Sequence, residues 1–217
     1  MKLRQTERFL FAGVPDGTFA ILGQSGTATK RRVTNAMTVT VAAEGPPAEV
    51  ELRLQPVTRV RGRVTSLRGA VAGALVSVQS EATRFYTRVT TDLEGAFETE
   101  VPEAARGVTL TVMAPGHALR AFEAPVDGSD LVLHVPSDGG TVRLLGMDTP
   151  NASLQQDGKR LWGGDLLSWS RSHGGAVVPG AALELPAVSP GLYRACAGSR
   201  CVEQTLAPGA AIELDFR

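Results

Sequence analysis

The sequence has no excess of either charge, no long apolar run and few aromatic residues. Its 217 residues include 22 Lys and Arg against 22 Asp and Glu. A balanced chain has no long-range field that would attract nucleic acid or an anionic membrane surface. No stretch approaches the roughly 18 apolar residues that a membrane-spanning helix needs. Aromatic residues make up only 5% of the chain, too few for a base-stacking platform on every unit. We therefore expect no nucleic-acid partner and no membrane-spanning segment.

The N-terminus lacks a recognisable export signal. Residues 1–11 superficially resemble a signal peptide, because a basic start precedes the apolar residues Phe9 to Phe11. Pro15-Asp16-Gly17 interrupts the apolar run, however, and no small-residue cleavage site follows it. We predict that the visible chain carries no signal peptide.

Cysteine is scarce, and the only two cysteines lie close together at Cys196 and Cys201. A hairpin that turns at Ala-Gly-Ser-Arg would bring their Cβ atoms within bridging range. The loop is short, so a disulfide there is expected to add only about 2 kcal/mol of stability. Reduced thiols and a redox or metal pair are the alternatives, but the spacing is not Cys-x-x-Cys and no histidine is nearby. A structural disulfide is favoured, and with it an extracellular, periplasmic or cell-surface location.

Patterns for catalysis and metal binding are also missing. The three histidines, His117, His134 and His173, are scattered, and none begins the His-x-x-Glu spacing of a zinc peptidase. Gly-x-Ser-x-Gly is absent, and Ser172 and His173, as neighbours on a strand, would point to opposite faces. We predict a chain that is not an enzyme and holds no metal or other cofactor.

What the sequence does contain is internal repetition. Three segments end with the same alternation of apolar and polar residues, which predicts half-buried antiparallel strands. Their last residues, 81 positions apart each time, are Leu54, Val135 and Phe216. A turn with proline and glycine recurs at intervals of 87 residues, and its first residues are Val14, Val101 and Val188. Two landmarks with nearly equal spacing indicate a tandem array of units of roughly 80 residues.

We divide the chain into three units: 1–56, 57–136 and 137–217. The middle unit alternates short strands with turns, and no helical periodicity stands out anywhere in the chain. Its expected strands cover residues 59–65, 74–78, 84–90, 96–99, 108–112, 118–123 and 129–135. Seven short strands at intervals of about ten residues indicate a β-sandwich. The predicted fold class is all-β, with tandem Ig-like or prealbumin-like antiparallel β-sandwich modules.

The first unit is short. Its turn at Val14 lies 13 residues after Met1, whereas Val101 lies 44 residues after Val57, where the middle unit opens. Residues 1–56 are therefore interpreted as the C-terminal part of a truncated module. The strands expected there are 8–14, 18–22, 29–33, 37–41 and 49–54. Because an incomplete sandwich leaves edges and an apolar face uncovered, we expect packing on the middle unit or self-association with another chain.

One run of the middle unit resembles a known family. The run comprises Gly62-x-Val64, Gly69 to Val78, Thr90-Thr91-Asp92-x-x-Gly95-x-Phe97, Gly107 to Val112 and Pro115-Gly116. It resembles the carboxypeptidase regulatory-like module, and residues 1–56 and 137–217 resemble parts of that module more loosely. The resemblance implies a transthyretin-like sandwich that acts as a non-catalytic bead in secreted or envelope proteins. Carbohydrate-binding modules share this fold, so the fold alone does not settle the function.

Two groups of side chains are candidates for binding. Arg59, Arg61 and Arg63 form a basic stripe on one strand face, and Glu98 with Glu100 forms an acidic stripe. Cross-strand pairing on a solvent face explains both stripes, and a patch for a partner is the alternative.

The second group surrounds Trp162, which shares a strand face with Arg160 and abuts two glycines. In a hairpin tip its ring would be exposed and able to stack on a sugar. Trp169 shares a face with Leu167 and is expected in the core.

Asp92 and Glu94 have a calcium-binding alternative. We favour the interpretation that Asp92 closes a turn before Gly95, because a calcium ion needs several oxygen ligands and few other oxygen-bearing side chains cluster there.

The predicted function is that of a non-catalytic scaffold or interaction module at a cell surface or envelope, which spaces, adheres or binds protein. A carbohydrate-binding accessory module that uses Trp162 is the alternative from another class. The expected partner is a protein or a glycan.

Overall fold

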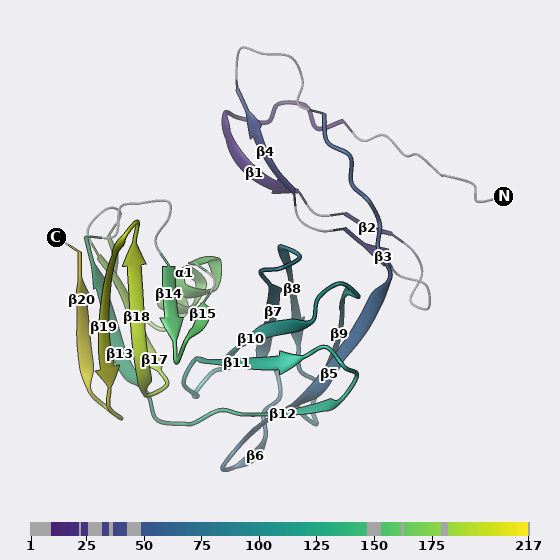
Figure 1. Ribbon diagram of the computed structural model, residues 1–217. Coiled ribbons are helices and arrows are strands. Elements are labelled where there is room, and N and C mark those ends of the chain that lie inside the picture. The colour runs from purple at the N-terminus through teal and green to yellow at the C-terminus, as the bar shows by residue number, and fades with distance from the viewer. Residues whose placement is uncertain are drawn as a thin grey trace.

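Two β-sandwiches follow one another along the chain (Figure 1). The structure, a computed structural model, describes residues 10–21, 23–25, 32–34, 37–42, 49–146, 153–161, 163–178 and 182–216. Strands dominate these residues, and one α-helix is present among them. The all-β fold with tandem sandwiches that the sequence predicts is confirmed.

We call residues 57–134 sandwich I. One of its sheets has the order β12-β5-β9, with the short β6 beside the end of β5, and the other has the order β11-β10-β7-β8. Its strands are β5 (Val57–Ser66), β6 (Gly69–Ala70), β7 (Leu75–Ser80), β8 (Phe85–Thr90), β9 (Ala96–Pro102), β10 (Gly107–Met113), β11 (Arg120–Pro125) and β12 (Asp130–His134). Its core is a cluster of small β-branched and aliphatic side chains that includes Val64, Val76 and Leu110.

We call residues 140–215 sandwich II. Its sheets have the orders β16-β17-β13-β20 and β15-β14-β18-β19. Its elements are β13 (Gly140–Leu145), β14 (Ser153–Gln156), β15 (Lys159–Leu161), α1 (Gly163–Ser172), β16 (Val177–Val178), β17 (Ala182–Val188), β18 (Gly191–Ala197), β19 (Arg200–Leu206) and β20 (Ala211–Asp215). Leu144, Leu185 and Tyr193 lie at the centre of its core.

The two sandwiches share one topology. In each, the first strand (β5 or β13) lies between an antiparallel strand (β9 or β17) and the last strand (β12 or β20). The second sheets, β8-β7-β10-β11 and β15-β14-β18-β19, also correspond strand for strand. The repeat in the sequence is therefore a repeat in the fold, whereas the exact division into three units stays a prediction.

The strands at the two later repeat endings pair differently from the prediction. Both β12 and β20 run parallel to their partners, β5 and β13, so the expectation of antiparallel pairing is wrong there. An apolar face predicts a strand but not its direction, since parallel and antiparallel neighbours can bury the same face.

The first of the three repeat endings is not a strand. Residues 49–54 alternate in sequence but have no strand partner among the described residues, and Leu54 is 41% exposed. Without a partner the backbone gains no ladder of hydrogen bonds, and alternation alone does not make a strand. Residues 10–14 are likewise not a strand, and residues 8, 9, 22 and 29–31 lie outside the described part.

The segment before sandwich I forms two small ribbons. β1 (Gly17–Ile21) pairs with β4 (Met37–Val41), and β2 (Gln24–Ser25) pairs with β3 (Arg32–Val33). Val33 exchanges backbone hydrogen bonds with Gln55 and is buried in the core of sandwich I. This part of the segment therefore packs on sandwich I, as expected, and completion by another chain stays a prediction.

The helix α1 was not expected, because the sequence suggested no helical periodicity. Its buried positions, Asp165, Leu166, Trp169 and Ser170, follow helical spacing over only ten residues, which is too short a run to stand out. Trp169 lies in the core as predicted, at 2% exposure, but Leu167 faces away at 38%. The shared strand face assumed for these two residues is wrong.

Candidate functional site

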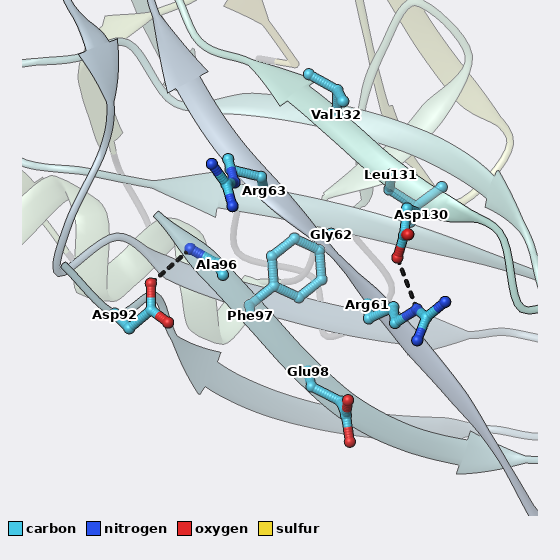
Figure 2. Close-up of a pocket in the computed structure, with 10 residues that line it drawn as sticks. All are labelled: Arg61, Gly62, Arg63, Asp92, Ala96, Phe97, Glu98, Asp130, Leu131 and Val132. Atoms are coloured by element: carbon cyan, nitrogen blue, oxygen red, sulfur yellow. Dashed lines mark hydrogen bonds and ion pairs between the residues drawn. The ribbon is translucent and has the colours of Figure 1, made fainter. Parts of the chain in front are cut away.

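The predicted arginine stripe lies on the outer face of the β12-β5-β9 sheet. Figure 2 shows two of its three residues, Arg61 and Arg63. Alternation along β5 turns Val60 and Val64 into the core, so Arg59, Arg61 and Arg63 point to solvent. We call this surface the arginine face. It also includes Glu98 of β9 and the exposed side chains of β12, and it forms an open depression of about 480 Å³.

Two of the three arginines are paired with acids across the sheet. Arg61 lies opposite Glu98 on β9 and Asp130 on β12, and its Nε is 2.6 Å from an Asp130 carboxylate oxygen. An Nη of Arg59 is 3.5 Å from a Glu98 oxygen. The cross-strand pairing predicted from the stripes is confirmed for these residues. All four side chains are at least half exposed, so each pair contributes about 0–1 kcal/mol.

Arg63 is different. Its neighbours across the sheet are Ala96 on β9 and Val132 on β12, where Arg61 has two acids. Within the described part of the chain, no carboxylate forms an ion pair with Arg63. Val132 is 72% exposed, so a free guanidinium lies beside an uncovered apolar side chain.

Gly62 lines the depression at a point where β5 and β12 approach closely. A Cβ added to Gly62 would lie 2.6 Å from the carbonyl oxygen of Leu131, so β5 and β12 approach too closely for a side chain. The Phe97 ring lies next to Gly62 and is buried in the core (Figure 2). The open shape suits a flat or extended partner better than an enclosed small molecule.

Sandwich II repeats the acid–arginine–acid arrangement. Arg143, at the centre of β13, lies opposite Glu184 of β17 and Glu213 of β20, with 3.0 Å between Arg143 Nε and a Glu184 oxygen. The position after next, which holds Arg63 in sandwich I, holds Leu145 here. The lone arginine is thus specific to sandwich I.

The glycan-binding residues predicted around Trp162 are only partly described. Trp162 lies outside the described residues, so its exposure stays untested. Arg160 is exposed on β15 and pairs with Glu81 of sandwich I at 3.0 Å, and its carbonyl oxygen accepts a hydrogen bond from Gln79. The contacts of Arg160 therefore join the two sandwiches.

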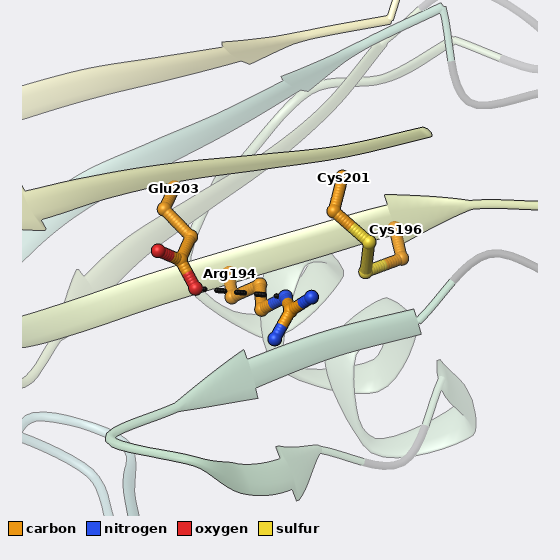
Figure 3. The surroundings of a disulfide bond; sticks show 4 residues. All are labelled: Arg194, Cys196, Cys201 and Glu203. Carbon is orange, nitrogen blue, oxygen red and sulfur yellow. Dashed lines mark ion pairs between the residues drawn. A yellow bond between two sulfur atoms is a disulfide. The ribbon is translucent and has the colours of Figure 1, made fainter. Parts of the chain in front are cut away.

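The predicted disulfide is present (Figure 3). Cys196 of β18 and Cys201 of β19 lie directly opposite each other in an antiparallel hairpin. The turn is the two-residue Gly198-Ser199, shorter than the four residues expected, because both strands continue past the cysteines. Arg194 and Glu203 form an ion pair at 3.5 Å beside the bridge.

The serine and histidine at the end of α1 lie together, contrary to the expectation for a strand. Ser172 Oγ is 2.9 Å from His173 Nδ1, and both atoms also contact the carbonyl oxygen of Trp169, at 3.0 and 3.1 Å. The hydroxyl group donates to that carbonyl, and the imidazole ring stacks on the Trp169 indole. The arrangement closes the C-terminal end of the helix and does not activate the serine as a nucleophile.

Asp92 closes a turn, as favoured from the sequence. Its carboxylate accepts hydrogen bonds from the amides of Glu94 and Ala96, at 3.0 and 2.7 Å. In the part of the chain that the structure describes, no group of three or more His, Cys, Asp or Glu residues could hold a metal ion. None of the described helices is long and apolar enough to span a membrane.

The most heavily bonded polar group was missed by sequence reasoning. Asp165, in the first turn of α1, is fully buried and accepts hydrogen bonds from Ser77, Tyr86 and Arg88 of sandwich I. Burial, followed by the hydrogen bond to Asp165, raises the pKa of Tyr86. A signal was present: β7 places Ser77 and Gln79 among valines, and both polar side chains are buried.

No protein-family model matches the chain, and no curated protein matches it. Several solved structures align with it weakly, and three of them follow. The Bacillus anthracis TIE protein is 14% identical, with 92% of this chain and 41% of that one covered, at a TM-score of 0.29. A streptococcal ancillary pilin is 10% identical, with coverages of 94% and 76% and a TM-score of 0.32. BcpA, the major pilin subunit of Bacillus cereus, is 11% identical, with coverages of 72% and 69% and a TM-score of 0.27. At such TM-scores a common fold does not follow.

Proposed function

We propose that this chain is a non-catalytic scaffold of an exported protein, which holds two sandwiches in a fixed arrangement and presents the arginine face to a protein partner. The observation that carries the proposal is the contrast between Arg63 and its two counterparts. Arg61 and Arg143 each lie between two acids of the chain, whereas Arg63 lies between Ala96 and the exposed Val132.

The chemistry of this site favours an extended segment with an acidic residue next to an apolar one. A carboxylate would pair with Arg63 in the way that Asp130 pairs with Arg61. An apolar neighbour in the partner would cover Val132, and charged and apolar contacts together give such an interface its orientation. The disulfide supports an oxidising compartment and so an exported protein.

The resemblance of the middle unit to the carboxypeptidase regulatory-like module remains part of this proposal. Its Thr-Asp-x-x-Gly-x-Phe run has a structural role at each named position. Thr91 bonds to backbone groups of Val71 and Ala74, and Asp92 closes the turn. Gly95 has a positive φ of 72°, with no room for a Cβ beside the carbonyl of Val64, and Phe97 enters the core.

The test is a selection of displayed random peptides on the full chain, with counter-selection on the double variant Arg63→Glu/Val132→Asp. We expect enriched peptides to pair an acidic with an apolar residue and to bind the wild type at least about tenfold better, roughly 1.4 kcal/mol. Peptides that bind both proteins equally, or that show no acidic residue, would refute the arginine face as the binding site.

The carbohydrate-binding alternative has its own test. A glycan array probed with the wild type and with Trp162→Ala separates it from the scaffold. Sugar binding that disappears in Trp162→Ala would replace the protein-binding proposal, and an array without signal would count against the alternative.

A further inference from the structure

The contacts between the two sandwiches lie at two opposite edges of one sheet. In the β11-β10-β7-β8 sheet of sandwich I, β11 and β8 are the outermost strands. Sandwich II contacts the outer face of this sheet at both ends, through groups of different kinds. The two sets of contacts therefore have different mechanical roles.

At the β11 edge sandwich I contributes backbone groups to the hydrogen bonds, and sandwich II contributes backbone groups and the side chain of Gln156, which accepts from the Ala121 amide. The amide of Leu119 donates to the carbonyl of Ala187, and the amide of Ser189 donates to the carbonyl of Leu119, both at 2.9 Å. The connection between the sandwiches starts nearby, where the amide of Ala118 bonds to Pro136. Leu119 and Ala121 also join the core of sandwich II. Because the chain connection and the backbone hydrogen bonds hold the two sandwiches together at this edge, we expect any relative movement to pivot there.

At the β7–β8 edge the contact with the most hydrogen bonds is a buried carboxylate. It lies beside two contacts of Arg160, whose carbonyl oxygen accepts from Gln79 and whose guanidinium pairs with the exposed Glu81. One oxygen of Asp165 accepts from Ser77 Oγ at 2.6 Å, and the other accepts from Tyr86 Oη and Arg88 Nη2, also at 2.6 Å. Arg88 also donates to the Tyr86 hydroxyl group. Three side chains of sandwich I thus converge on one side chain of sandwich II, and the Asp165 side chain is 0% exposed.

The Asp165 carboxylate lies on α1, an element that sandwich I lacks. Between β15 and β17 sandwich II contains α1, whereas β8 and β9 are joined by the short turn at residues 91–95. Asp165 lies in the first turn of α1, where the helix dipole favours a negative charge. Charge-assisted hydrogen bonds require defined directions, which apolar contacts do not.

We propose that Asp165 is a latch: it holds sandwich II against the β7–β8 edge, and without it sandwich II swings about the backbone contacts at β11. Most of each core lies within one sandwich, and the buried residues that sandwich I contributes to the other core, Met113, Leu119 and Ala121, lie at β10 and the β11 edge, about which the movement would occur. The latch therefore determines whether the two sandwiches move as one body. The proposed scaffold function requires such rigidity, but it does not identify the residue that provides it.

The experiment measures residual dipolar couplings of backbone amides in the full chain, for the wild type and for Asp165→Asn. An asparagine can replace only one of the two acceptor oxygens, and the Arg88 guanidinium loses its buried counter-charge, so the latch is weakened while the size is kept. We expect the wild-type sandwiches to fit one common alignment tensor and those of Asp165→Asn to require two. The melting temperature should fall by roughly 10 °C, because the guanidinium loses its buried partner.

A matched control and a second variant separate the outcomes. Asp130→Asn makes the same substitution in an exposed pair within sandwich I, and it should keep one tensor. Ser77→Ala/Tyr86→Phe/Arg88→Met removes the donors from sandwich I alone, and it decides the question if Asp165→Asn does not fold. One common tensor in a folded latch variant overturns the proposal. So does selective loss of the amide signals of sandwich II, which would assign Asp165 to the fold of that sandwich. Asp165→Asn and the triple variant leave the residues of the arginine face unchanged, so the peptide selection on them tests the proposed function separately.

Discussion

Sandwiches I and II have the same topology, yet corresponding sheets face different surroundings. The outer face of β11-β10-β7-β8 in sandwich I is covered by sandwich II, and Met113, Leu119 and Ala121 enter the core of the neighbour. The outer face of β15-β14-β18-β19 in sandwich II carries Arg194, Glu203 and the disulfide, all at least partly exposed. One fold thus serves as an interface in one copy and as a solvated surface in the other.

The burial patterns of the strands reflect this difference. β7 is buried on both faces and loses the alternation expected of a half-exposed strand, whereas β19 is mostly exposed. A strand that is covered on both sides approaches the continuous burial typical of buried sheets. Polar residues within such a strand, as at Ser77 and Gln79, therefore indicate an interface with hydrogen-bonding partners.

The largest effect on stability is expected at the centre of the first strand, where sandwich II has a buried leucine and sandwich I has a glycine. Leu144 is fully buried in β13, next to Arg143. Leu144→Ala should lower the free energy of unfolding by about 2–5 kcal/mol, because it leaves a cavity in the core of sandwich II. Urea unfolding followed by circular dichroism measures the loss. A loss below about 1 kcal/mol would show that the site collapses to fill the space.

The corresponding residue of sandwich I, Gly62, should respond to the opposite change. In Gly62→Ala the new methyl group would lie 2.6 Å from the Leu131 carbonyl oxygen and 2.8 Å from the Leu131 Cβ. We expect a loss of about 1–3 kcal/mol from the forced separation of β5 and β12. Hydrogen exchange of the β12 amides measures it locally. Gly107→Ala, in β10, where the nearest atom to the new methyl group would be 3.6 Å away, is the control for the loss of a strand glycine without a close contact.

The sequence predicts the parts of this fold that depend on local alternation and turns. The strands of sandwich I, the disulfide and the outward arginines of β5 follow from period-two patterns and from a short hairpin. The direction of β12 and β20, the absence of a strand at residues 49–54 and the latch at Asp165 depend on partners remote in sequence. No local pattern encodes such partners. Helix α1 is intermediate, because its periodic face is real but only ten residues long.

A smaller effect is expected from the disulfide, which only sandwich II possesses. Cys196→Ser/Cys201→Ser should lower stability by about 2 kcal/mol, because the bridge closes a very short loop. The double variant should keep its fold, since the core of sandwich II is formed by other residues. Urea unfolding of the oxidised and reduced wild type gives the same quantity independently. Full alkylation of the native, unreduced protein would contradict the bridge itself.

The smallest effects on stability are expected when Arg61, Arg143 and Arg63 are each replaced. The comparison among the three variants tests whether Arg63 differs from its two counterparts. Arg61→Gln and Arg143→Gln each break an exposed ion pair, so each should lower stability by no more than about 1 kcal/mol, and added salt should reduce the difference from the wild type. Arg63→Gln breaks no ion pair within the described part of the chain, so it should leave stability and its salt dependence unchanged. Urea unfolding at low and high ionic strength measures all three. A loss at Arg63 equal to that at Arg61 would mean that Arg63 already has a partner within the chain, and the case for a binding partner at the arginine face would fail.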